Sequence, residues 1–218
     1  MIKEGLLTNE TMNISNLKIF ELPQDKIVPE NFSANDIDLS KLVDEAKQGA
    51  YFRSKCDDNV FFEAKLDKMV DSLKDVNGLS TNLRHMKGEN IQSGRGRFME
   101  IERAYKQQQE NGEKVVSIGK VVEVPGYGGT DIDVLVEKSP GEGKWIENKH
   151  VKNISCDDSF KNKIDKMSAA ATQGLKVDGL KIKETVFVNS GSITDQAKAY
   201  ADGKGVTILD NWKHSKPA

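Results

Sequence analysis

Apolar residues recur at intervals of three and four in two segments of the first half of the chain. The first segment, residues 36–52, contains Leu39, Leu42, Val43, Ala46 and Ala50. The second segment, residues 59–76, contains Phe62, Leu66, Met69, Val70 and Leu73. This spacing places the apolar side chains on one face of a helix. We therefore expect an antiparallel pair of helices that bury a common apolar stripe.

The helical pattern is interrupted between residues 79 and 97, where polar residues predominate and glycine recurs. Polar, glycine-rich stretches are typical of loops and linkers. We therefore expect a domain junction here. A mainly helical N-terminal domain, which we interpret as an entry or targeting module, covers residues 1–90, and a second domain covers residues 91–218. A helical pattern returns at Phe98 and ends at Asn111-Gly112, a common stop signal.

Strand patterns follow this helix. Residues 113–125 are rich in β-branched side chains, and in residues 130–137 the apolar side chains alternate with other residues. Residues 144–151 alternate in the same way after a turn at residues 139–143 that contains glycine and proline. A period of two indicates strands. The second and third strands should therefore form a hairpin.

The remaining residues continue the mixture of helices and strands. A helical stripe begins near Asp157 or Asp158, and residues 183–190 form a β-branched run. A short helical segment over residues 194–205 and an apolar run over residues 206–212 complete the pattern. The chain is therefore predicted to have an α/β (α+β) fold, with a mixed sheet flanked by helices.

The predicted hairpin brings acidic residues together. Alternation places Asp131 and Asp133 on one face of the first strand, and Glu147 and Lys149 share a face of the second. Carboxylate oxygens are the ligands that Mg²⁺ and Mn²⁺ prefer. A solvated charged face is the simpler interpretation of a lone Glu-x-Lys. Two aspartates in an otherwise apolar strand favour a site, because aspartate is disfavoured in strands.

The pattern of Asp133, a turn and then Glu147-Asn148-Lys149 resembles the PD-(D/E)xK nuclease superfamily. The resemblance extends to the order of elements over residues 94–212, which can be read as the family's αβββαβ core. One departure is that Pro125 precedes the aspartate by eight residues, so the literal Pro-Asp pair is absent. The resemblance implies a metal-dependent endonuclease that hydrolyses phosphodiester bonds.

The resemblance also implies roles for individual residues. Asp133, Glu147 and the Asn148 carbonyl would bind a divalent metal, with Mg²⁺ expected first and Mn²⁺ or Zn²⁺ as alternatives. Lys149 would face the attacking water or the phosphate, and Asp131 is the alternative ligand. A glutamate of the preceding helix would lie near the metal, and we favour Glu100 over Glu102. The polar positions of the following helix that could approach the phosphate are Lys161, Lys163 and Gln173, and we keep Lys161 and Gln173 as candidate site residues.

Charge gives limited information about the substrate. The net charge of the 218 residues is −2, so the overall charge gives no support to nucleic-acid binding through a polybasic surface. Arg95, Arg97 and Lys152 are the candidates for contacts with the phosphate backbone. We expect DNA as the substrate, with tRNA or another RNA as the alternative. No apolar run approaches the length of a membrane span, so stable membrane insertion is not expected.

A variable helical module before a compact nuclease also resembles bacterial polymorphic toxins, including contact-dependent growth-inhibition effectors. This resemblance implies delivery as part of a larger secreted protein and action in the cytoplasm of a target bacterium. It also implies an immunity protein that neutralises the toxin. A restriction or repair nuclease and a non-catalytic nucleic-acid-binding module remain the alternatives.

Overall fold

The computed structural model describes residues 38–54 and 59–211, which belong to one compact unit. Its first part is helical: α1 (Leu39–Lys47), α2 (Ala50–Arg53), α3 (Asn59–Leu73), α4 (Leu79–Gly88) and α5 (Ile91–Glu110). Asp38 caps α1 through a hydrogen bond from the Lys41 amide, and Asn90 caps α5 through one from the Ser93 amide. Helices are present in both predicted segments, but the segment over residues 36–52 is divided at Gln48 and Gly49 into α1 and α2.

The stretch over residues 79–97 is not a linker, contrary to the sequence-based expectation. It forms α4 and the first two turns of α5. Leu79, Leu83 and Met86 are buried at helical spacing, and the charged residues between them face outward. These three apolar residues were too few to stand out among the polar side chains and glycines around them.

Strands make up most of the second part of the described chain. They are β1 (Lys114–Val124), β2 (Gly128–Ser139), β3 (Glu142–Lys149), β4 (Asn153–Ile154), β5 (Lys176–Val177), β6 (Leu180–Asn189), β7 (Ser192–Ile193) and β8 (Thr207–Leu209). Two helices lie among them, α6 (Asp158–Gln173) and α7 (Asp195–Gly203). The main sheet has the order β1-β2-β3-β6-β5, and β8 also pairs with β6. It is a mixed sheet flanked by helices, which confirms the predicted fold class at this level.

The directions of the central strands follow from their connections. β1, β2 and β3 are successive antiparallel neighbours, whereas β6 returns after α6 and pairs in parallel with β3. A parallel pair needs a crossover, and α6 provides it. The antiparallel pairing of β2 with β3 confirms the predicted pairing of residues 130–138 with residues 143–150.

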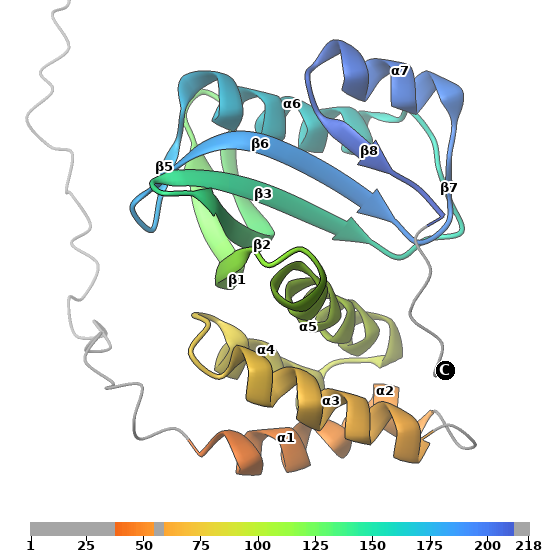
Figure 1. Ribbon diagram of the computed structural model, residues 1–218. Coiled ribbons are helices and arrows are strands. Elements are labelled where there is room, and N and C mark those ends of the chain that lie inside the picture. Colours follow the sequence, from red (N-terminus) through yellow and green to blue (C-terminus); the bar gives the residue numbers. More distant parts are fainter. Residues whose placement is uncertain (1–37, 55–58, 212–218) are drawn as a thin grey trace, which may run out of the picture. The chain divides into compact units, whose positions relative to one another are not determined.

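Two hydrophobic cores lie on opposite faces of the sheet. In Figure 1, α6 and α7 cover one face, while α5 covers the other with α1, α3 and α4 beyond it. The core on the α5 side includes Phe52, Leu83 and Phe98 from the helices and Val134 and Ile146 from the sheet. This core contains residues from both sides of the boundary predicted between residues 90 and 91.

Candidate metal centre

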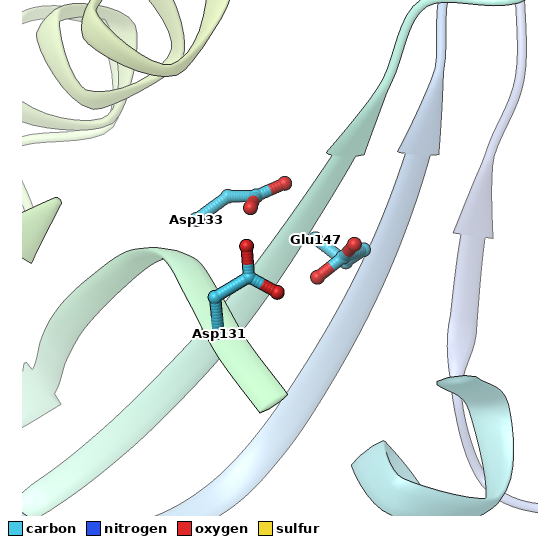
Figure 2. Close-up of side chains that lie close together, drawn as sticks. All are labelled: Asp131, Asp133 and Glu147. Carbon is cyan, nitrogen blue, oxygen red and sulfur yellow. The ribbon is translucent and has the colours of Figure 1, made fainter. Parts of the chain in front are cut away.

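Three carboxylates gather at one end of the β2–β3 pair. Asp131 and Asp133 come from β2 and Glu147 comes from β3, and one carboxylate oxygen of each lies within 4.8 Å of the others. Figure 2 shows the three side chains grouped closely together. The register explains this grouping, because Val134 faces Ile146 and the next positions outward are Asp133 and Glu147. Cross-strand neighbours on one face lie close enough to interact.

The three carboxylates differ in exposure and in partners. Glu147 is fully buried and Asp133 is 4% exposed, whereas the Asp131 side chain is 51% exposed. Asp133 accepts a hydrogen bond of 2.6 Å from the Asn148 amide through Oδ2. That bond fixes the carboxylate of Asp133 against the β3 backbone, just beyond Glu147.

Two lysines bind this group of carboxylates. Lys149 Nζ lies 2.7 Å from Glu147 Oε1, and Lys163 Nζ on α6 lies 3.1 Å from Glu147 Oε2. Lys163 Nζ also lies 3.0 Å from Asp131 Oδ1. Glu147 is thus held between two ammonium groups that come from different elements.

Helix α5, on the face of the sheet opposite to α6, adds a fourth carboxylate. Glu100 is 9% exposed, and its Oε2 accepts a hydrogen bond of 3.0 Å from the Asn82 side chain. Arg97 Nη1 lies 3.4 Å from Glu100 Oε1. Glu100 and Asp133 line the same hollow, so the preference for Glu100 over Glu102 agrees with the geometry.

Burial and crowding change the protonation of these groups. Burial raises the pKa of Asp133 well above its usual range, and the charges of Glu147 and Glu100 raise it further. Burial also raises the pKa of Glu100, although Arg97 opposes this. Burial acts to raise the pKa of Asp131 too, but the charge and hydrogen bond of Lys163 outweigh it, so that the pKa is lowered. The negative charge around Asp133 is therefore incompletely balanced by the chain itself.

Burial has the opposite effect on the pKa values of the two lysines. Burial acts to lower the pKa of Lys149, but Glu147 and Asp133 outweigh it and leave the pKa raised. Burial of Lys163 is likewise outweighed by Glu147 and Asp131, so its pKa is raised as well. Both side chains are ammonium ions near neutral pH.

The donor set fits a hard divalent cation. Mg²⁺ and Mn²⁺ take oxygen ligands and are typically held by one or two carboxylates plus water. The cluster offers only oxygen ligands, and a cation among them would offset the repulsion that raises the pKa of Asp133.

The other residues proposed from the sequence lie in different places. Glu102 lies on a different face of α5 and pairs with Lys65 of α3. Gln173, at the end of α6, donates a hydrogen bond of 3.4 Å to the Pro125 carbonyl. Lys161 lies about 200° around α6 from Lys163, because two residues advance a helix by that angle. Neither Glu102, Gln173 nor Lys161 therefore joins the carboxylates.

The basic candidates divide in the same manner. Arg95 and Arg97 line the hollow that contains Asp131 and Asp133. Lys152 is exposed, and its carbonyl accepts a hydrogen bond from the Ser192 amide. Lys163 is the residue that the sequence analysis missed, since Lys161 and Gln173 were the candidates kept from that helix, whereas Lys163 is the one that pairs with Glu147 and Asp131.

Comparison with known proteins adds little to this description. No protein-family model matches the chain, and no curated protein matches it. Among solved structures, the crystal structure of AF1548, a protein of unknown function, is 17% identical with a TM-score of 0.36. The similarity covers 50% of this chain and 54% of the other, so the chain spans about half the length of that protein.

Within residues 38–54 and 59–211, no helix combines the length and the apolar character needed to cross a membrane.

Proposed function

We propose that this protein is a metal-dependent nuclease of the PD-(D/E)xK type that hydrolyses phosphodiester bonds. The observation that carries the proposal is the meeting of Asp133 and Glu147 on adjacent strands, with Lys149 in contact with Glu147. The order α5-β1-β2-β3-α6-β6 supports it, because the family's αβββαβ core has the same order.

The residues that would hold the metal are Asp133, Glu147 and Asp131, with the Asn148 carbonyl as a further oxygen ligand. Bound there, a divalent ion would supply a Lewis acid for the phosphate oxygens and a water of lowered pKa. The sequence offered Asp131 as an alternative to Asp133. Their common proximity to Glu147 supports a role for both.

The chain's own cations then have distinct tasks. Lys149 carries a raised pKa, so it acts as a charged group that stabilises the phosphate oxygens rather than as a general base. Lys163 orients Glu147 and Asp131 through its two ion pairs. Glu100 lines the same hollow as Asp133 and contributes through water.

The experiment that tests the proposal compares wild type with Lys149→Ala on plasmid DNA and on total tRNA. Reactions are run in EDTA and in Mg²⁺, Mn²⁺ or Zn²⁺. We expect wild type to cut only with metal, and Lys149→Ala to be slower by at least about a hundredfold, as for loss of an electrostatic group in an active site. Lys161→Ala, on the far side of α6, is the matched control and should keep wild-type rates. Equal rates for wild type and Lys149→Ala would contradict the proposal.

The toxin role is a second proposal, which rests on the layout of the sequence. In it, the nuclease acts in the cytoplasm of a target bacterium and an immunity protein covers the cleft. Expression of wild type alone should then stop bacterial growth, whereas Lys149→Ala should be tolerated. Normal growth with wild type, combined with good cleavage in vitro, would favour a restriction or repair nuclease instead.

A further inference from the structure

Two hollows open on either side of Lys149. The α5 hollow, of about 530 Å³, lies between the first turns of α5 and the carboxylates, and includes Gln92, Arg95, Arg97, Asp131 and Asp133. The α6 hollow, of about 460 Å³, lies beside the first turns of α6 and includes Asn153, Ser155, Ser159, Asn162 and Lys166. Lys149 and Val151 line both hollows. Each hollow is within the size range of pockets that hold small ligands.

Lys149 and Val151 form the ridge between the two hollows, and Val151 is an exposed apolar side chain. Val151 is 47% exposed, and the residues that line the two hollows with it are mostly polar or charged, apart from Ile154, Phe160 and Phe187 in the α6 hollow. An isolated exposed valine is ordinary on a protein surface. Val151 is notable for its position, because it lies two residues after Lys149 on the wall that both hollows share.

The ridge is held rigidly from behind. The Val151 amide donates a hydrogen bond of 3.2 Å to Oδ1 of Asn189, which is fully buried. The Lys152 carbonyl accepts one of 3.1 Å from the Ser192 amide. Gly191 permits this packing, because a Cβ there would lie 2.3 Å from the Val151 carbonyl oxygen. Val151 is thus positioned by the fold before any ligand arrives.

The walls of the hollows suit nucleotides. The α6 hollow presents the amides Asn153 and Asn162 and the hydroxyls Ser155 and Ser159, which offer both donors and acceptors to the edge of a base. Lys166 supplies positive charge beside them, whereas the charge of Lys163 is directed at Glu147 and Asp131. In the α5 hollow, Arg95 supplies charge and Gln92 an amide, whereas Arg97 pairs with Glu89 and Glu100.

We propose that the two hollows take two consecutive nucleotides whose bases are splayed apart over Val151, so that the substrate is unpaired where it is cut. This inference rests on the proposed nuclease function, and it names the substrate class as an unpaired strand of DNA or RNA. Stacked bases of a duplex cannot enter two separate hollows, whereas apolar side chains that wedge between bases separate them. The phosphate between the two nucleotides then lies over Lys149, next to the carboxylates.

The test measures base stacking directly. Short oligonucleotides of alternating adenine and 2-aminopurine, made as DNA and as RNA, are bound to Asp133→Asn protein, which retains the shape of the site but should cut at least about a hundredfold more slowly. Stacking quenches 2-aminopurine, and with this alternation any splayed step contains one fluorescent base. We expect fluorescence to rise on saturation, and Val151→Ala in the same background to lose most of the rise. Val121→Ala, at a 76% exposed valine of β1, is the matched control and should keep it.

Cleavage by wild type separates this inference from the nuclease proposal. An unpaired strand should be cut at least about tenfold faster than the same sequence in a duplex, because the duplex must first be opened. The DNA and RNA arms show which sugar is accepted. Equal cleavage of strand and duplex, or unchanged fluorescence at saturation, would overturn the splayed arrangement while the nuclease proposal stands. Failure to cut any nucleic acid would overturn both.

Discussion

Two buried glutamates lie two residues apart on α5, in opposite electrostatic surroundings. Glu102 is fully buried and pairs with Lys65, and burial lowers the pKa values of the nearby Arg103 and Lys106 while the charge of Glu102 opposes this. Glu100 faces the sheet, where burial and repulsion raise the pKa values of both Glu100 and Asp133. One glutamate thus lies among an excess of cations, and the other lies among an excess of carboxylates.

The difference separates structural charge from functional charge. A buried ion that the chain neutralises by itself, as Glu102 is, needs nothing from outside. Carboxylates that repel each other in a buried place cost stability, and such arrangements occur at functional sites where a cation or a substrate compensates them. The comparison predicts that variants on the two sides of α5 change different properties.

The largest expected effect is on the Glu102 side. Glu102→Ala should lower the free energy of unfolding by about 3 kcal/mol, because it removes the buried carboxylate that pairs with Lys65. This value is the lower end for breaking a buried pair, since the Lys65 side chain is 14% exposed. Chemical denaturation measures this. Asp67→Ala removes the half-exposed partner of Lys47 and is the control, with an expected loss below about 1 kcal/mol. Similar losses in the two variants would show that the Glu102 pair is not structurally important.

The next effect is on activity and comes from the carboxylate side. Asp133→Asn should cut at least about a hundredfold more slowly, the magnitude expected for loss of a group that acts in the transition state. Its melting temperature without metal should not fall, because a carboxylate with a raised pKa is removed. Asp131→Ala, at a half-exposed residue, should be milder. A strongly destabilised Asp133→Asn protein would place Asp133 with Glu102 as a structural residue.

The smallest effect is a dependence of stability on pH. The folded pKa of Asp133 is raised above the unfolded value of about 3.9, so the folded state binds the proton more tightly. Its contribution to stability is therefore complete below pH of about 4 and is lost as pH rises through the folded pKa. Denaturation in EDTA over this interval should show the decline. Asp133→Asn should reduce it, while Glu100, whose pKa is also raised, retains part of it.

Excess Mg²⁺ provides the control for this pH dependence. Because a bound cation favours the ionised carboxylates, Mg²⁺ should flatten the decline in wild type. The same decline in wild type and in Asp133→Asn, with and without Mg²⁺, would contradict the assignment of the effect to the metal centre.

Much of the site could be predicted from the sequence because strands have a strict period of two. Alternation in residues 130–137 and 144–151 places Asp131 and Asp133 on one face of a strand, and Glu147 with Lys149 on one face of its neighbour. A short turn joins the two strands, so no distant contact was needed to pair them. The hairpin and the positions of its acidic residues could therefore be predicted from a single segment of about twenty residues.

Tertiary structure alone decided which residues from other elements join the hairpin. Lys161, Lys163 and Gln173 are equivalent polar positions in the sequence, and the packing of α6 on the sheet selects Lys163. Residues 79–97 read as a linker because polar side chains and glycines surround the few apolar ones, yet α4 forms where α1 and α5 cover Leu79, Leu83 and Met86. The hollows beside Lys149 likewise depend on α5 and α6, which approach the hairpin from opposite faces of the sheet. Local pattern determines which face a side chain takes, whereas its partners depend on how distant elements pack.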